Sequence, residues 1–478
     1  MVLIPLVGAT FLALTFAAAA PAQEPTVPVV LQRLDMALTV NFSEHTIDGS
    51  AVLQLRNYTS GPVARVPLQV GRLMEVTNAR DASGNSLKFT QDVVRFSDWP
   101  ARQMDQVWIE LPAALAAGQS TSVEVKWNGT LTPYTETGML HVRERIDSAF
   151  TILREETGAF PVVGVPSRAA MRKAPREDFE YHVRVTVPAY EVAALGGRLV
   201  SRTTNGSSVT YEYQSRGSAP FVNIPVAPYG LLQRDGVRVY YLRADSVGAA
   251  STLLGATRGL SLLAEWFGPM GDTLDLAIME IPSGYGSQSN LRSGIIQSAA
   301  AFQNKERLGE LYHELSHLWN APLQDRPSPR WEEGLASFLE ELMAEKIDGA
   351  VNAQAAAQKY ASTVVQRFGR DTANQRLAFA DYGRAGKTDY SYSVGHLLFS
   401  VLYETLGQEN FNRAVGGYYQ QYRLTGATTR QFVDYVKQHS PYDLSELFND
   451  WMYTTKWYDR LKQGETIQRM AATYRKAT

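Results

Sequence analysis

The sequence predicts a multidomain fold in which an all-β amino-terminal domain precedes a mixed α/β and α-helical domain. Three observations support this prediction. The chain has 478 residues, which is enough for two or three domains. Short segments that alternate apolar and polar residues, with turn residues between them, fill residues 27–234, and this pattern is typical of β-strands. Beyond residue 281 the apolar residues recur mainly at helical spacing, which favours helices.

The amino terminus has the pattern of an export signal. Residues 2–20 are an almost unbroken apolar run that ends in an A-x-A cleavage pattern at residues 20–22. We therefore expect residues 1–22 to be a signal peptide and the protein to be secreted or periplasmic. No Lys or Arg occurs before Arg33, so an uncleaved membrane anchor is the alternative, and stable membrane contact is expected only in that case. The chain contains no cysteine, so an exported form must rely on its core rather than on disulfides.

Residues 23–234 are predicted to form the amino-terminal β domain. Turn-rich pieces at residues 82–85 and 204–207 separate strands in this region. The clearest alternating segments, each expected to be a strand, are Ala51–Leu55, Val107–Leu111, Val183–Val187 and Val209–Tyr213.

Residues 235–478 are predicted to form the second domain. Its last part is expected to be helical, and Gly407 should end the helix that begins near Tyr392. Before that part, the pattern changes from strand to helix and back, which indicates a mixed α/β region. The elements expected there are a strand at residues 237–241, a helix at residues 249–267 and an apolar strand at residues 274–281.

The charge balance of the chain is close to neutral. There are 46 Lys and Arg residues against 48 Asp and Glu residues, and the sequence pI is about 6.4. No long basic or acidic run occurs. The sequence therefore gives no reason to expect nucleic acid as a partner.

The segment His313-Glu314-Leu315-Ser316-His317 has the pattern H-E-x-x-H. Two histidines four residues apart share one face of a helix, so they can bind one metal ion from adjacent turns. Glu314 then lies beside the open coordination position, where its carboxylate can accept a proton from a water molecule. Two solvated surface histidines are the alternative, but the leucines of this segment predict a half-buried helix.

A second carboxylate follows at a suitable place. Residues 327–329 read Pro-Ser-Pro and break the chain, helical spacing resumes at residue 331, and Glu333 falls in the first turn of the new helix. Two histidines and one carboxylate leave a fourth position open, as in catalytic zinc sites, and the absence of cysteine excludes a thiolate site. We expect one zinc ion per chain, bound by His313, His317 and Glu333.

These motifs resemble those of gluzincin zinc metallopeptidases of the aminopeptidase N (membrane alanyl aminopeptidase) family. In that family H-E-x-x-H is followed by a glutamate ligand in an N-E-G-F-A segment, and residues 332–336 read E-E-G-L-A with Glu333 at the ligand position. The intervening loop is shorter, fifteen residues here against the family's usual eighteen. The pair Trp319-Asn320 is similar to the glycyl aminopeptidases, a neighbouring gluzincin family.

The resemblance implies a β-saddle-like first domain and a thermolysin-like catalytic domain, and residues 159–161 match an A-F-P of the family's first domain. It also implies that Tyr392, in the segment Y-S-V-G, donates a hydrogen bond to the oxyanion of the tetrahedral intermediate. With 24 tyrosines in the chain, a packing role is the alternative. The chain ends at Thr478, without room for the family's large carboxy-terminal helical domain, so a more open active site is expected.

One family element departs from the pattern. The G-x-M-E-N strand, whose glutamate binds the free amino terminus of a substrate, corresponds to residues 286–290 here. The substrate-binding candidates are therefore Gly286, Ser289 and Asn290. Ser289 stands where the glutamate is expected, and a hydroxyl cannot pair with an ammonium group as a carboxylate does. Three carboxylates elsewhere could take over this role: Glu155, Glu156 and Glu280.

The sequence thus predicts a secreted zinc metallopeptidase with peptides as substrates, most simply an aminopeptidase acting on short peptides. An endopeptidase that needs no free amino terminus is the first alternative. A non-catalytic binding module with a structural zinc ion is the second, although such a module would need neither Glu314 nor Tyr392.

Overall fold

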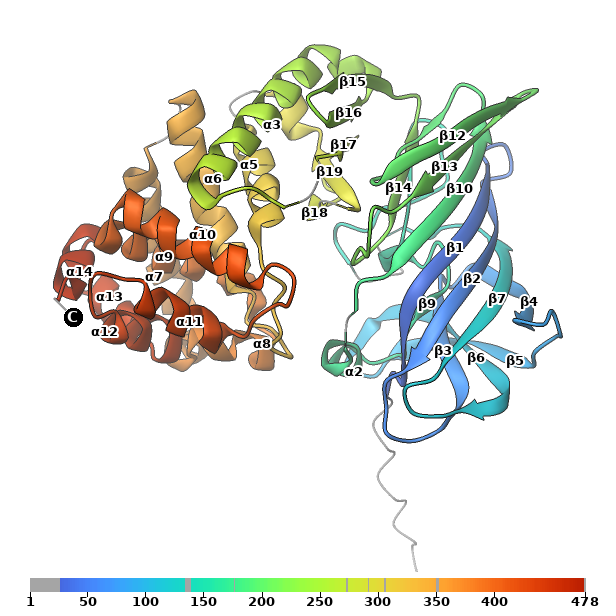
Figure 1. Ribbon diagram of the computed structural model, residues 1–478, viewed down its shortest axis with the longest axis horizontal. Helices are drawn as coiled ribbons and strands as arrows, with labels where there is room; N and C mark the ends of the chain where they lie inside the picture. Colours follow the sequence, from blue (N-terminus) through green and yellow to red (C-terminus); the bar gives the residue numbers. More distant parts are fainter. Residues whose placement is uncertain are drawn as a thin grey trace, which may run out of the picture.

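The computed structural model describes residues 26–133, 139–175, 177–271, 274–290, 292–304, 307–349 and 352–476. The predicted signal peptide, residues 1–22, lies outside the described residues. Strands of the amino-terminal part and helices of the carboxy-terminal part lie on opposite sides of the molecule, and a smaller sheet lies between them at one end (Figure 1). The predicted order, a β-rich part followed by an α/β and helical part, is confirmed.

The amino-terminal part contains a seven-stranded sheet in the order β12-β13-β10-β1-β2-β7-β4, in which only β1 and β10 pair in parallel. A four-stranded sheet, β5-β6-β3-β9, and a three-stranded sheet, β11-β14-β8, complete it. The four segments predicted as strands lie in β2, β6, β10 and β13. The strands are β1 (Val29–Asn41), β2 (Thr46–Asn57), β3 (Val63–Val70), β4 (Met74–Asp81), β5 (Phe89–Phe96), β6 (Trp99–Leu115), β7 (Ser120–Gly129), β8 (Thr151–Arg154), β9 (Val162–Val163), β10 (Glu180–Pro188), β11 (Val192–Ala193), β12 (Arg198–Asn205), β13 (Ser208–Gln214) and β14 (Asn223–Ala227).

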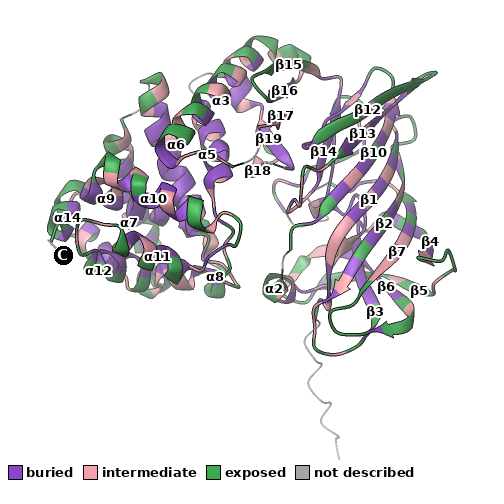
Figure 2. Ribbon diagram, in the orientation of Figure 1, coloured by how far each residue is buried: buried purple, intermediate pink, exposed green. Residues whose placement is uncertain are grey.

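Alternation of buried and exposed residues along these strands builds one core. In β7, for example, Val123, Val125 and Trp127 are buried while the residues between them are not. Successive side chains of a strand point to opposite faces, so this pattern places one face of the sheet on the core. Figure 2 shows the same alternation on β1, β2 and β10, whereas β12 is exposed along nearly its whole length.

The carboxy-terminal part, which corresponds to the predicted catalytic domain and is called the catalytic part, begins with a five-stranded sheet. Its order is β15-β16-β17-β19-β18, with β16, β17 and β19 parallel. Every residue of β17 is buried, which explains why all of them but Glu280 are apolar. The boundary predicted between residues 234 and 235 falls in the turn that joins β15 to β16. The strands are β15 (Gly230–Arg234), β16 (Val237–Tyr241), β17 (Leu276–Ile281), β18 (Gln288–Asn290) and β19 (Gly294–Ser298).

Helix α3 (Ser246–Phe267) packs on this sheet and against the helices that follow. The stretch Arg243–Phe267 is long and apolar enough to cross a membrane by length and composition alone. This is weak evidence for a membrane span, because core helices pass the same test. Here Leu260, Leu263 and Phe267 are buried in the core of the catalytic part.

The helices of the catalytic part surround the apolar core formed around α6 and α9. A capping box of Thr428 and Gln431 is present at the start of α11, and Gly407 ends α9 as predicted. The helices are α4 (Ala300–Gln303), α5 (Gly309–Ser316), α6 (Trp331–Asp348), α7 (Ala353–Arg370), α8 (Tyr382–Ala385), α9 (Ser391–Leu406), α10 (Gln408–Tyr422), α11 (Thr429–Gln438), α12 (Ser445–Phe448), α13 (Lys456–Lys462) and α14 (Ile467–Tyr474), with α2 (Arg168–Lys173) in the amino-terminal part.

Two glycines let α6 and α9 approach each other at the site described below. A β-carbon added to Gly334 would lie 2.3 Å from the Cα of Gly395, and one added to Gly395 would lie 2.6 Å from the Cα of Gly334. Both obstacles are backbone atoms, which cannot turn aside as a side chain can. Gly334 follows Glu333 directly, and Gly395 lies on the same helix as Tyr392, so this contact fixes the separation of two candidate site residues.

We expect Gly395→Ala to lower the free energy of unfolding by about 1–3 kcal/mol, because the added methyl group forces the two helices apart. Thermal or denaturant unfolding measures this change. Gly369→Ala is the matched control, since Gly369 lies in α7 with nothing within 4 Å of an added β-carbon. That control should be neutral or stabilising by up to about 1 kcal/mol. Equal stability of the two variants would show that the close approach of α6 and α9 is not required.

Candidate metal centre

Helix α5 and the turn after it position the two histidines. Leu311 and Leu315 are buried on one side of α5, so His313 on the adjacent face is turned toward the cavity described below. The predicted half-buried helix ends before the second histidine, because α5 stops at Ser316 and the 3₁₀ turn η4 (His317–Trp319) follows. Pro322 lies three residues beyond that turn and cannot continue a helix.

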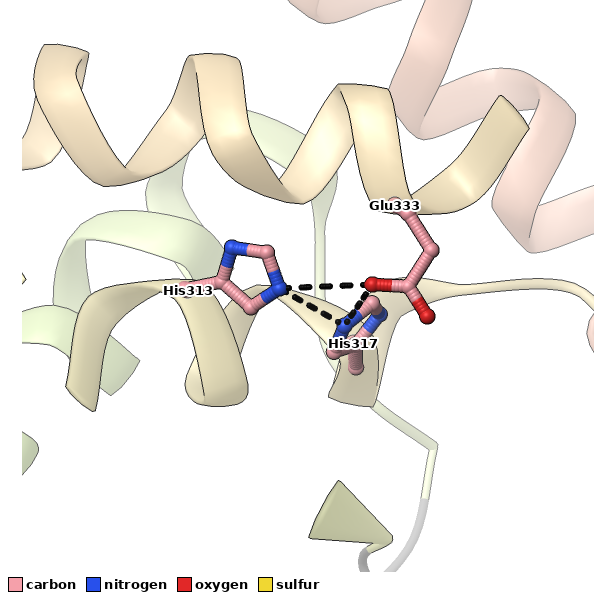
Figure 3. Close-up of side chains that lie close together, drawn as sticks. All are labelled: His313, His317 and Glu333. Carbon is pink, nitrogen blue, oxygen red and sulfur yellow. Dashed lines mark hydrogen bonds and ion pairs between the residues drawn. The ribbon is translucent and has the colours of Figure 1, made fainter. Parts of the chain in front are cut away.

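Glu333 lies in the first turn of α6, as predicted. The start of this helix is anchored by Trp331, which is buried and stacks on Phe432 with 4.1 Å between the ring centroids. Helix α6 packs against α5. This packing places the carboxylate of Glu333 opposite the two imidazoles, which reach it from the other element (Figure 3).

The three side chains converge on one point. His313 Nε2 and His317 Nε2 are 3.3 Å apart, and each lies 3.4 Å from Glu333 Oε2. A tetrahedral zinc site with bonds of about 2.05 Å has ligand atoms roughly 3.35 Å apart. The triad therefore fits three corners of a tetrahedron around a zinc ion, and a fourth corner is left for water or substrate.

The charges of the triad call for a cation at its centre. Burial would lower the pKa of His313, but Glu333 and Glu340 raise it to about 10. Burial would likewise raise the pKa of Glu333, yet the two imidazoles hold it well below its usual range. Both shifts express the same need for positive charge between these groups, which a divalent metal ion meets without a proton.

Two partners of the histidines were not predicted from the sequence. Glu340 Oε2 lies 3.4 Å from Nδ1 of His313, and the carboxamide nitrogen of Asn320 lies 2.7 Å from Nδ1 of His317. When Nε2 binds a metal, Nδ1 carries the proton, so the Asn320 carboxamide must turn its oxygen toward the ring. Glu340 lies two helical turns after Glu333 on the same face of α6, a spacing that the sequence does contain.

Glu314 and Tyr392 lie in the same cavity as the triad. Burial raises the pKa of Glu314, while the two imidazoles lower it. The ring of Tyr392 stacks on that of His313, with centroids 6.0 Å apart and 10° between the planes. Burial and the charge of Glu333 raise the pKa of Tyr392, so its hydroxyl keeps its proton and can donate a hydrogen bond.

The cavity has a volume of about 1070 Å³ and is lined by both parts of the chain. The amino-terminal part contributes residues between 141 and 223, and the catalytic part contributes β18, α5, the start of α6 and Tyr392. The lining includes the candidate site residues and the polar side chains around them: His141, Glu155, Glu156, Gly286, Gln288, Ser289, Asn290, Glu314, Asn320, Arg330, Glu332, Glu333, Glu340 and Tyr392.

The proposed substrate-binding residues differ in how free their side chains are to contact a substrate. Gly286, Ser289 and Asn290 all line the cavity, but the Asn290 carboxamide oxygen accepts the backbone N–H of Arg292 and Ser293 in the turn after β18. Their part in binding substrate stays a prediction.

The three alternative carboxylates also differ in place. Glu155 and Glu156 line the cavity, whereas Glu280 is not among the described residues around it. Glu280 is buried in β17, where its Oε2 accepts the backbone N–H of Leu242, and burial raises its pKa to about 9. Glu280 is therefore uncharged at neutral pH and is not suited to binding an ammonium group.

Residues 295–451 match the Peptidase family M1 domain. The chain carries a peptidase family M1 domain and is a zinc metallopeptidase. The expected resemblance to gluzincins of the aminopeptidase N type, the enzyme class and the zinc ion are confirmed. A comparison with curated proteins finds no match.

Solved structures share the fold of this chain. An M1 zinc metallopeptidase from Deinococcus radiodurans is 18% identical, with a TM-score of 0.62 over 94% of both chains. A variant of that enzyme bound to a Tyr-Ser-Ala substrate is 19% identical, with a TM-score of 0.65 over 89% of this chain and 94% of the other. A two-domain M1 zinc metallopeptidase variant bound to L-arginine has a TM-score of 0.63 at 19% identity, over 94% of this chain and 95% of the other.

We expect His317→Ala to remove one of three ligand atoms and to lose the zinc ion during purification. Metal analysis of the dialysed protein measures this loss. Glu314→Gln is the control, because Glu314 lies beside the triad without belonging to it, and that variant should retain about one zinc ion per chain. Full zinc content in His317→Ala would contradict the assignment of the metal centre.

Proposed function

We propose that this zinc metallopeptidase is an exported aminopeptidase that acts on short peptides. The observation that carries the proposal is the position of Glu156. This carboxylate belongs to the amino-terminal part of the chain, yet its Oε1 accepts a hydrogen bond of 3.2 Å from Nε2 of Gln288, the neighbour of Ser289 in β18. A negative charge is thus supplied to the strand at which the family's amine-binding glutamate is missing.

The residues of the site can be given roles in peptide hydrolysis. A zinc ion held by His313, His317 and Glu333 would polarise the scissile carbonyl and lower the pKa of a water molecule. Glu314, unbound to the metal, would take a proton from the attacking water and pass it to the leaving amine. Tyr392 would donate a hydrogen bond to the oxyanion, a contact worth about 3 kcal/mol in the transition state.

Glu156 is suited to an ammonium group by its charge. Burial would raise its pKa, but the hydrogen bond with His141 and the charge of Arg154 lower it below its ordinary value. The carboxylate is therefore ionised at neutral pH. Its Oε2 pairs with Nη1 of Arg154 at 3.3 Å, and its Oε1 lies 3.3 Å from Nε2 of His141. The side chain as a whole is 31% exposed and lines the cavity, so the carboxylate can be approached from there.

An extended peptide also has a surface to bind. β18 is the last strand of its sheet and pairs with β19 on one side only, among the described residues. Peptide backbones bind to such an edge through main-chain hydrogen bonds, which are insensitive to the side chains. The solved M1 structure with Tyr-Ser-Ala contains a short peptide of the kind we propose for this chain.

An endopeptidase is the alternative, favoured by the neutral side chain of Ser289. The two activities differ in one requirement, since only an aminopeptidase gains binding free energy from the substrate's ammonium group. A comparison of substrates with free and blocked amino termini therefore separates them.

We expect Glu156→Gln to reduce kcat/KM for free amino-acid amides by about 10-fold to 100-fold, because a charge-assisted hydrogen bond of roughly 1.5–3 kcal/mol is lost. Fluorogenic amino-acid amides measure this change, and their amino-blocked forms should not be cleaved by the wild-type protein. Glu280→Gln is the matched control, because it removes a carboxyl group that is buried, uncharged and outside the cavity. Preferential cleavage of the blocked amides would favour the endopeptidase.

Export is the second part of the proposal and rests on the apolar run at residues 2–20. We expect protein recovered from the periplasm or medium of a bacterial host to begin at Gln23, as read by amino-terminal sequencing. Recovery of protein with residues 1–22 intact in the membrane fraction would favour the uncleaved anchor.

A further inference from the structure

Arg330 occupies an unusual backbone conformation at the metal centre. It is the residue before α6, with φ 56° and ψ 44°, in the left-handed region. The other described non-glycine residues with positive φ, His45 and Asp235, lie in the turns of hairpins, where such angles are common. A residue with a β-carbon is strained in this region, and it persists there only when its surroundings hold it.

The side chain of Arg330 engages one oxygen of the zinc ligand. Its Nη2 donates to Oε1 of Glu333. The other oxygen, Oε2, is the one that lies 3.4 Å from Nε2 of both histidines. The two oxygens of Glu333 therefore have separate tasks, because one faces the metal position and the other is occupied by a guanidinium group.

Arg330 also lies over Tyr392. Its guanidinium carbon is 6.0 Å from the centroid of the Tyr392 ring, which also stacks on the imidazole of His313. A hydrogen bond also joins the residues that precede Arg330 and Tyr392. The Ser391 hydroxyl donates to the carbonyl of Pro329 with a distance of 2.6 Å. The residue before Tyr392 is thus tied to the residue before Arg330, and the two side chains keep their relation.

We propose that Arg330 is a positioning residue that keeps Glu333 a single-oxygen zinc ligand and holds Tyr392 in its place beside the metal. A carboxylate that used both oxygens would occupy the position that water or substrate requires. With Oε1 held by Arg330, that position stays open. In this chain the zinc ligand Glu333 has a cationic partner, Arg330, three residues before it.

Arginine suits this task better than lysine. The guanidinium group is planar, stays charged at every physiological pH and lies flat on aromatic rings, so it can contact a carboxylate and a tyrosine ring at once. The ammonium group of a lysine could pair with Oε1 of Glu333, but it has no flat face to lie on the ring of Tyr392. We therefore expect Arg330→Lys to retain part of the function and Arg330→Gln to lose it.

The first test measures metal binding, so it does not depend on the proposed peptidase activity. Chelator competition should show that Arg330→Gln binds zinc about 10-fold to 100-fold more weakly than the wild type, as for other groups that orient a metal ligand. In the cobalt-substituted protein, visible absorption should fall, since a carboxylate free to bind through both oxygens raises the coordination number. Arg330→Lys should give values between the two.

The second test uses the reaction. For an amino-acid amide with a free amino terminus and no carboxylate, Arg330→Gln should lower kcat by about 10-fold or more and leave KM within about 2-fold, because orientation of Glu333 and Tyr392 matters in the transition state. Arg384→Gln is the control, since Arg384 forms an exposed pair with Asp381 three residues away, at 2.9 Å, outside the cavity. That variant should match the wild type in every measurement.

Unchanged zinc affinity and an unchanged cobalt spectrum in Arg330→Gln would overturn the proposal. So would an effect confined to KM for substrates with a free carboxylate, because Arg330 would then bind substrate rather than position the ligand. If Arg330→Gln fails to fold, Arg330→Gly replaces it, since glycine adopts the left-handed conformation without strain and still lacks the guanidinium group. The same loss of zinc affinity is expected of Arg330→Gly.

Discussion

The site depends on holding three ligand atoms from two separate helices within 3.4 Å of one another. No single element can do this, because His313 and His317 come from α5 and its terminal turn while Glu333 comes from α6. The separation is set by the packing of α5 against α6, with Leu311 and Leu315 buried in the core, while the glycine contact between α6 and α9 sets the place of Tyr392. The apolar core of the catalytic part thus determines the geometry of a polar site.

The charge of the cavity makes the cation indispensable to that geometry. The described lining residues include eight carboxylates and a single arginine, Arg330. Carboxylates brought together in a partly enclosed space repel one another and raise one another's pKa. A zinc ion offsets two negative charges at the centre, and Arg330 offsets a third beside it. The same surplus of negative charge favours substrates that bring an ammonium group into the cavity.

Local motifs could be predicted from the sequence, and long-range contacts could not. The spacing of His313, Glu314 and His317 has meaning within a single helix, so the pattern alone indicated a metal site. Glu333 was predicted from its place in the first turn of the next helix and from the resemblance, but a proline-rich loop separates it from the histidines, so its distance from them could not be predicted. Glu340 could have been predicted from the sequence, since it lies two turns after Glu333 on the same face of one helix. Glu156 was one of three equal candidates, because a sequence separation of 132 from Gln288 leaves their contact unpredictable from spacing.

The departure at Ser289 has a structural consequence beyond the loss of one charge. If Glu156 receives the amino terminus, recognition of the substrate depends on how the amino-terminal part is held against the catalytic sheet. Arg154 provides that link, since its guanidinium is buried, pairs with Glu144 and donates to the carbonyls of His141 and Tyr285 at 3.0 and 3.1 Å. Breaking a buried charge pair costs about 3–5 kcal/mol, because the remaining charge is left uncompensated. Of these contacts only the hydrogen bond to Tyr285 crosses between the two parts, and it does so beside Glu156, where exopeptidase specificity would require a fixed arrangement.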